Sequence, residues 1–427
     1  MTQHVSSGAG GRRVPHLAVA LRYVFRQGWV WFCLVAVAAG NTAVMLDRGA
    51  PWRGDLVWTI DWLPISLILV GPLISGFVAV DTARLAVGVQ ALPLPRGRTF
   101  DLAVAMTYGL ALAGLHLVYS IGTVAVSRPP VIDAAAPLAV LAQVAMLIFF
   151  VALGSLIGRF APVVLGGLGA ALAALLCVYL FSAPGSPVGL LYAGAATTPR
   201  IGYRYNATWL LVQIGALVVV ALATWVVRPG AHRSRLRVLA TGATAVVLTI
   251  GAGAAVQAVP GDRLEADGAV PDACGSLAEV PWCYYPQHER VAGFYADNLL
   301  LLFEAATTQG YPDLVPQRVL EADQRAWPTS ATTGVFYVTP EALAGQRPDL
   351  WETALRLIEP AHCPQLAGEL PPAERYWEDL TALTGTWVGL VDRSLAEQNG
   401  YFGDPMTPEE ARHVMAGFRD CTYPFEG

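Results

Sequence analysis

The chain contains no lysine, and all 27 of its basic residues are arginine. This absence excludes two kinds of site, because a P-loop needs a lysine on the nucleotide phosphates and Schiff-base chemistry needs a lysine amine. Charge is also scarce: 14% of the residues are charged, against about 25% in an ordinary soluble domain. With 55% hydrophobic residues and a mean hydropathy of +0.48, the composition indicates a membrane protein that binds no ATP through a P-loop of its own.

Catalytic motifs are missing as well. The segment that starts at His288 and Glu289 begins like a zinc-protease helix, but no second histidine follows at the required spacing. The chain has no G-x-S-x-G nucleophile elbow. A metal site built from His288, His362, Cys363 and His413 is conceivable, but disulfides are a better use of the cysteines. We therefore expect no enzyme activity, no cofactor and no metal site.

Seven apolar stretches are long enough to cross a bilayer, which takes about 20 mostly apolar residues. They lie near residues 28–46, 62–80, 102–124, 137–157, 162–181, 207–227 and 238–256. The first stretch is too long for a cleavable signal peptide, and no small-residue cleavage site follows it.

The arginines predict the orientation of these spans. With the N-terminus in the cytoplasm, twelve arginines fall in cytoplasmic segments and five in the short outer loops, as the positive-inside rule requires. The charge also divides the chain, because residues 1–256 carry a net charge of +11 and residues 257–427 a net charge of −16. We expect a cytoplasmic N-terminus over residues 1–27, a transmembrane domain over 28–256 and an extracytoplasmic domain over 257–427.

The last 170 or so residues are enough for one independent domain. Helical spacing predicts helices near 287–308, 349–358, 372–400 and 406–418, the last with a capping box made by Thr407 and Glu410. The segments "GVFYVTP" and "VPWCYYP" are typical of short strands. The predicted fold class is thus an α-helical polytopic membrane protein with an α+β, mostly helical C-terminal domain.

Four of the six cysteines fall in this domain, and Cys33 and Cys177 lie within predicted spans. Cys274, Cys283, Cys363 and Cys421 allow three pairings, among which sequence alone cannot choose. One of them joins Cys274 to Cys283 in a short loop and Cys363 to Cys421 near the C-terminus. Disulfides in any of the three pairings fit an oxidising compartment for this domain.

The loop between the second and third spans contains "ALPLPRGRTF", residues 91–100. Residues 82–92 can form a short amphipathic helix on the membrane surface, which Pro93 and Pro95 would end. Arg96 and Arg98 mark the cytoplasmic face. A plain positive-inside loop explains these arginines, but it does not explain the apolar residues that lead into the Leu-Pro pattern.

This loop resembles that of type-2 ABC exporter permeases, in which a coupling helix is followed by Leu-Pro, a hydrophobic and a small residue, and Arg. Leu92, Pro93, Leu94 and Arg96 match that pattern. Residues 14–32, which include Arg22 and Arg26, resemble the family's amphipathic connector helix, and residues 182–206 resemble its short re-entrant outer helices.

The chain also departs from the family. Asp81-Thr-Ala-Arg84 stands where the family loop usually has acidic residues and Gly-Thr, and a seventh span and an outer domain are added. The C-x8-C start of that domain resembles extracytoplasmic tails of bacterial membrane proteins.

The resemblance implies a permease subunit in a bacterial plasma membrane, moving an unidentified substrate with a separate cytoplasmic ABC ATPase. It implies a second permease copy or sister subunit as well, and ATPase contact through Arg84, Leu92 to Arg98, and the connector helix. The lipid bilayer is a further partner, and no nucleic acid is expected. The alternative is a membrane-anchored sensor or scaffold whose outer domain binds a ligand or a protein.

Polar side chains within the spans are costly and so mark packing or function. Asn41 in the first span and His116 in the third are the clearest cases. For His116, helix packing through a hydrogen bond and contact with a substrate are both open. The "GSLIG" segment, Gly154 to Gly158, is a small-xxx-small pattern that permits close helix contact.

Overall fold

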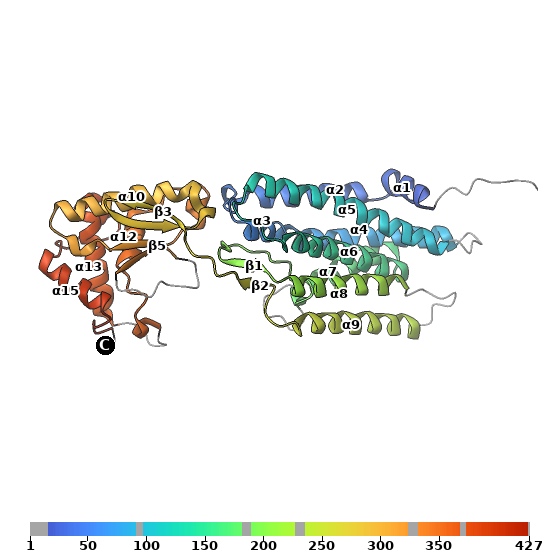
Figure 1. The fold of residues 1–427 in the computed structure, drawn as a ribbon. Helices are drawn as coiled ribbons and strands as arrows, with labels where there is room; N and C mark the ends of the chain where they lie inside the picture. The colour runs from blue at the N-terminus through green and yellow to red at the C-terminus, as the bar shows by residue number, and fades with distance from the viewer. Residues whose placement is uncertain are drawn as a thin grey trace, which may run out of the picture.

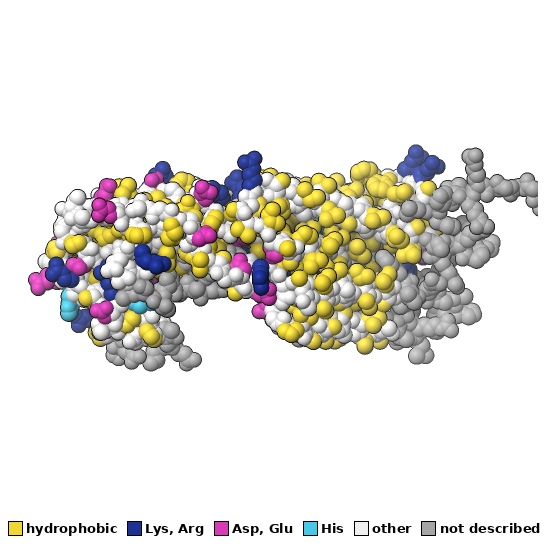
Figure 2. Space-filling model, viewed as in Figure 1, with side chains coloured by type: hydrophobic (Ala, Val, Ile, Leu, Met, Phe, Trp, Pro, Cys, Tyr) yellow, Lys and Arg dark blue, Asp and Glu magenta, His cyan; other side chains and the backbone are white. Residues whose placement is uncertain are grey.

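The structure is a computed structural model that describes residues 16–90, 97–181, 189–226, 235–322, 332–367 and 373–425. The molecule is elongated, with a helical bundle at one end and the C-terminal domain at the other (Figure 1). Hydrophobic side chains cover the visible face of the bundle, whereas charged side chains gather over the C-terminal domain and the junction (Figure 2).

The bundle begins with a short helix, α1 (His16–Arg26), followed by eight more. These are α2 (Val30–Leu46), α3 (Leu56–Trp62), α4 (Ile65–Gln90), α5 (Gly97–Ser127), α6 (Ala136–Phe160), α7 (Val163–Phe181), α8 (Ala207–Val226) and α9 (Arg235–Gln257). Among the described residues, six helices are long and apolar enough to cross a membrane, with α3 and α4 counted together as one. They correspond to the first six predicted spans.

The seventh predicted span corresponds to α9. Its described residues include an apolar helical stretch, Val246–Gln257, that is shorter than a membrane span. Nevertheless, α9 has 23 residues and packs along α8 (Figure 1). It therefore returns the chain to the bundle end where the C-terminal domain lies.

Helix α4 packs against α2, α6 and α7. Gly154 and Gly158 of α6 face α4 so closely that a Cβ on either would clash with the carbonyl oxygen of Ser75 or of Ala79. The small-xxx-small segment is thus a packing face, as the pattern suggested.

The structure contradicts one expectation, and a second is not met in the described part of its segment, residues 189–206. Residues 82–90 do not form a separate surface helix but continue α4 to Gln90, because no proline interrupts the chain between Pro72 and Pro93. Residues 189–202 contain no helix, and Gly194 and Ala195 have positive φ angles that a right-handed helix cannot contain. The chain instead forms β1 (Tyr203–Tyr205), which pairs antiparallel with β2 (Leu264–Ala266).

The C-terminal domain contains a four-stranded sheet in the order β3-β4-β5-β6. The hairpin of β3 (Ala273–Leu277) and β4 (Val280–Tyr284) is antiparallel, and β5 (Arg318–Glu321) and β6 (Thr333–Phe336) extend it in parallel. Both predicted strands are confirmed as β4 and β6, while β3 and β5 were not predicted.

The helices of this domain follow the predicted pattern. They are α10 (Glu289–Thr308), α11 (Pro340–Leu343), α12 (Leu350–Ile358), α13 (Glu374–Val391), α14 (Arg393–Gln398) and α15 (Pro408–Arg419). The capping box of Thr407 and Glu410 is confirmed at the start of α15. The helix predicted over 372–400 is divided, because the side chain of Asp392 accepts a hydrogen bond from the Ser394 N–H and starts α14.

The structure joins Cys274 to Cys283 and Cys363 to Cys421. The first pair lies directly opposite across the β3–β4 hairpin. The second ties the chain just after α12 to the residues just after α15, so that the C-terminus is held against the domain. Cys33 and Cys177 are free thiols.

Candidate functional site

One end of the bundle, here called the connector end, holds α1, the last turn of α4 and the first turn of α5 (Figure 1). Helix α1 is amphipathic: it buries Ala20 and Val24 and exposes Arg22 and Arg26. A tight turn at Gly28 then leads into α2. An amphipathic helix is thus present within residues 14–32, where the sequence predicts one, and it packs on α5.

Asp81 of α4 joins three parts of the connector end. Its carboxylate, buried in the structure, accepts hydrogen bonds from the backbone N–H of Trp29 at 2.8 Å and from the hydroxyl of Tyr108 on α5. Gly28 lies so close that a Cβ there would be 2.7 Å from an Asp81 oxygen. One carboxylate thus fixes the turn between α1 and α2 against α4 and α5.

Arg84 completes this junction one turn further along α4. Its guanidinium lies 4.0 Å from the Asp81 carboxylate and 5.4 Å from the centre of the Trp29 ring. Trp29 in turn stacks on Phe77 at 5.5 Å. The Asp81-Thr-Ala-Arg84 segment therefore fixes the turn that follows α1.

Most of the predicted coupling loop lies outside the described residues. Leu92, Pro93, Leu94, Pro95 and Arg96 lie outside the described residues, and Arg98 belongs to the first turn of α5 with a side chain that also lies outside them. The helix ends that flank the loop, at Gln90 and Gly97, belong to the connector end.

The two intramembrane polar residues each bond to a neighbouring helix. His116 Nε2 lies 2.9 Å from the side-chain oxygen of Gln143 on α6, whose amide donates to the Ile60 carbonyl. Asn41 accepts a hydrogen bond of 2.6 Å from the Ser66 hydroxyl on α4. Both are fully buried, which favours the packing role for His116.

The opposite end, here called the domain end, is joined by a buried ion pair. Arg263, just after α9, donates two hydrogen bonds of 2.6 and 2.8 Å to the carboxylate of Asp61 on α3. Both side chains are 1% exposed. Tyr205 donates to the same carboxylate at 2.8 Å, and its ring lies 5.1 Å from the guanidinium carbon.

The C-terminal domain sits directly on this end. Trp52, Trp58 and Trp62 of the bundle belong to the same buried cluster as the domain's own core. Arg290 of α10 donates to the backbone carbonyls of Pro51 and Arg53. The bundle and the domain are therefore packed together by side chains and by backbone contacts.

Asp55 adds a further connection at this end. Its carboxylate caps α3 by accepting the Trp58 N–H and also accepts the Arg200 N–H at 2.7 Å. Burial raises the pKa of Asp55, and the two N–H donors oppose that rise. The segment before β1 is thus fixed to the start of α3.

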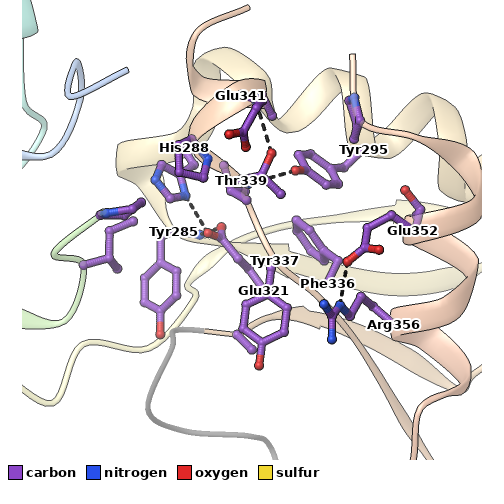
Figure 3. Close-up of a pocket in the computed structure, with 18 of the residues that line it drawn as sticks. Tyr285, His288, Tyr295, Glu321, Phe336, Tyr337, Thr339, Glu341, Glu352 and Arg356 are labelled. Atoms are coloured by element: carbon purple, nitrogen blue, oxygen red, sulfur yellow. Dashed lines mark hydrogen bonds and ion pairs between the residues drawn. The ribbon is translucent and has the colours of Figure 1, made fainter. Parts of the chain in front are cut away.

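A cavity of about 840 Å³ lies between the 199–203 segment of the bundle and the C-terminal domain. On one side His288 Nδ1 lies 2.5 Å from the Glu321 carboxylate, which also accepts the Tyr285 N–H (Figure 3). On the other side Glu352 is paired with Arg356 (Figure 3). The volume of the cavity is within the range of small-molecule sites, and its lining is mixed aromatic and polar.

No family model, curated protein or solved structure matches this chain. Its function is therefore inferred from its own residues.

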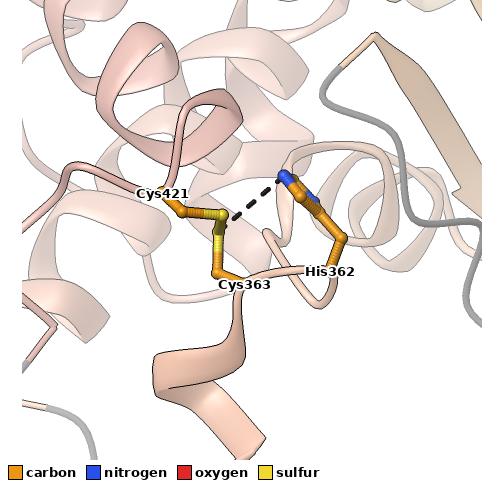
Figure 4. A group of neighbouring side chains, drawn as sticks. All are labelled: His362, Cys363 and Cys421. Carbon is orange, nitrogen blue, oxygen red and sulfur yellow. Dashed lines mark hydrogen bonds between the residues drawn. A yellow bond between two sulfur atoms is a disulfide. The ribbon is translucent and has the colours of Figure 1, made fainter.

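The metal-site candidates are separated in space. His288 is in the cavity, whereas His413 is exposed on α15. His362, Cys363 and Cys421 lie together (Figure 4), but the two sulfurs are bonded to each other, and His362 Nε2 donates to the Arg419 carbonyl. This group does not offer three free ligands.

Sequence analysis missed Asp61, Asp81 and Arg263. The signal was present for the first two, because an acidic residue inside an apolar run is costly and so marks a specific partner. Their partners, however, come from distant parts of the chain: Arg263 is 202 residues from Asp61.

Proposed function

We propose that this chain is the membrane-spanning permease subunit of an ABC-type exporter, driven by a separate cytoplasmic ATPase that contacts the connector end. The observation that carries the proposal is the junction at Asp81. It ties an amphipathic helix to the two helices that flank the "LPLPR" loop, so a force on either the loop or α1 acts on both.

Helix α4 supplies a path for that force. It runs for 26 residues from Ile65 to Gln90, or about 39 Å at 1.5 Å per residue. At its far end it follows α3, whose Trp58 and Trp62 are buried with the core of the C-terminal domain. Movement of the loop by an ATPase would therefore be transmitted to the domain end.

The orientation is part of the proposal. The arginine bias favours a cytoplasmic connector end, and two disulfides in the C-terminal domain favour an oxidising compartment for the domain end. A second permease copy or a sister subunit would complete the translocation path.

The test is to purify the tagged full chain from its host and to identify any stoichiometric ATPase by mass spectrometry. Replacing Pro93 and Pro95 with Ala should reduce both ATPase association and membrane-stimulated ATP turnover. The matched control is Pro129→Ala with Pro130→Ala, a proline pair outside the connector end, between α5 and α6. Unchanged association and turnover in the first variant would contradict ATPase coupling.

A second variant separates docking from transmission. Asp81→Asn keeps the size of the side chain but weakens its bonds to Trp29 and Tyr108. We expect the ATPase to remain bound while its turnover loses dependence on the permease. Turnover equal to wild type would contradict the role of this junction.

The cavity at the domain junction favours a second candidate, a membrane-anchored sensor. A ligand there would contact both the bundle segment at Arg200 and the C-terminal domain. Failure to recover any ATPase with the wild-type chain would favour this function over export.

A further inference from the structure

We propose that Arg200 binds a phosphate group at the domain end of the bundle, where two cavities share it as a lining residue. This inference goes beyond the exporter proposal and does not depend on an ATPase. It rests on the position of Arg200, on the absence of an ion pair for its side chain in the described chain, and on the residues around it.

Arg200 lines the cavity of about 840 Å³ at the domain junction and also a second cavity of about 420 Å³ on the bundle. Tyr203 lines both as well. The backbone of Arg200 is fixed, because its N–H donates to Asp55 at 2.7 Å. The Arg200 backbone is therefore fixed at a point where the linings of the two cavities meet.

The guanidinium is not neutralised by the protein. Arg200 forms no ion pair with any residue of the described chain, and its Nε is buried without a hydrogen-bond partner. A guanidinium cannot shed its proton, and a buried unpaired N–H is costly. An external anion would supply the acceptor that this nitrogen lacks.

Two carboxylates of the bundle are already used, and those that line the larger cavity belong to the C-terminal domain: Glu321, Glu341, Asp349 and Glu352. Asp55 accepts two backbone N–H groups, and Asp61 is occupied by Arg263. Asp262 lines the smaller cavity, but it is exposed and is not paired with Arg200. The arginine that precedes β1 thus differs from Arg204 within β1, which pairs with Glu265 at 2.9 Å.

The residues around Arg200 favour a phosphate group that lies close to the membrane surface. Tyr192, Tyr203 and Trp209 line the smaller cavity, and Trp209 stands in the first turn of α8, a candidate membrane span. Tyrosine and tryptophan are enriched where a membrane meets water. The planar fork of arginine matches phosphate oxygens in a bidentate manner. The phosphate is that of a lipid head group or a free phosphate ion.

The test uses the delipidated full chain in neutral detergent, with thermal unfolding followed by tryptophan fluorescence. Phosphatidylglycerol is compared with diacylglycerol, which lacks a phosphate, and inorganic phosphate with chloride at equal ionic strength. A ligand that binds the folded state alone raises the midpoint, so wild type should be stabilised by at least one phosphate source. Stabilisation by phosphatidylglycerol alone identifies a lipid, and stabilisation by inorganic phosphate identifies a soluble ion.

Arg200→Gln should weaken the apparent affinity about 10- to 100-fold, as expected for the loss of charged hydrogen bonds. Arg200→Lys keeps the positive charge but loses the planar guanidinium, so its apparent affinity should fall between those of wild type and Arg200→Gln. This variant serves as the test if Arg200→Gln does not fold. Arg204→Gln is the matched control and should bind as wild type does. The proposal is overturned if neither source stabilises wild type, if Arg200→Gln keeps wild-type affinity, or if Arg204→Gln loses as much.

Discussion

The buried ion pair of Asp61 and Arg263 offers the sharpest test of how the bundle is held together. It joins α3 to the segment after α9, with both side chains 1% exposed and two hydrogen bonds between them. Asp61→Asn removes the negative charge while keeping the shape. It leaves the Arg263 guanidinium buried and without a counter-charge.

The expected loss is about 3–5 kcal/mol of unfolding free energy, the usual cost of breaking a buried pair from one side. Replacing both partners with apolar residues, as in Asp61→Leu with Arg263→Met, should recover most of that loss, because no charge then remains buried. Tyr205 keeps a partner in the double variant, since its hydroxyl also donates to the Val57 carbonyl at 3.1 Å.

The assay is reversible unfolding in mixed detergent micelles. Asp61→Asn is compared with wild type, and wild type, Asp61→Leu, Arg263→Met and the double variant form a mutant cycle. The double variant should lose less than either single variant, so the coupling energy should be at least about 3 kcal/mol in favour of the pair. A loss below about 1 kcal/mol for Asp61→Asn, or a double variant that loses the sum of the singles, would refute this reasoning. Either result would mean that the pair is solvated or is not formed.

Three further predictions concern the disulfides, the orientation and helix packing. Replacing Cys363 and Cys421 with Ser should lower the stability of the C-terminal domain by about 4 kcal/mol, because that bond spans a separation of 58 residues. Alkylation of the unreduced, denatured wild type should label two thiols, Cys33 and Cys177, and no more. Alkaline phosphatase fused to the C-terminus should be active and a fluorescent protein fused there should be dark; the reverse would place the domain in the cytoplasm. Gly154→Leu should push α6 away from α4 and lower the unfolding temperature, whereas Gly114→Leu, with open space around it, should change it little.

The sequence by itself determined the features that depend on local chemistry. Span lengths follow from the number of apolar residues that cross a bilayer, and the capping box of Thr407 and Glu410 follows from a spacing of three residues. The gathering of four cysteines in the acidic half likewise predicted disulfides there, although it left their pairing open.

The tertiary structure decided which distant groups meet. The continuation of α4 to Gln90 replaced an expected surface helix, and the choice of Cys363 with Cys421 depended on α12 and α15 ending side by side. The contact of Asp61 with Arg263 depends on where the chain after α9 meets α3. Periodicity and hydropathy show which face of a helix is apolar, but they do not show which other helix packs against that face. Pairings across 58 or 202 residues therefore appear only once the whole chain is packed.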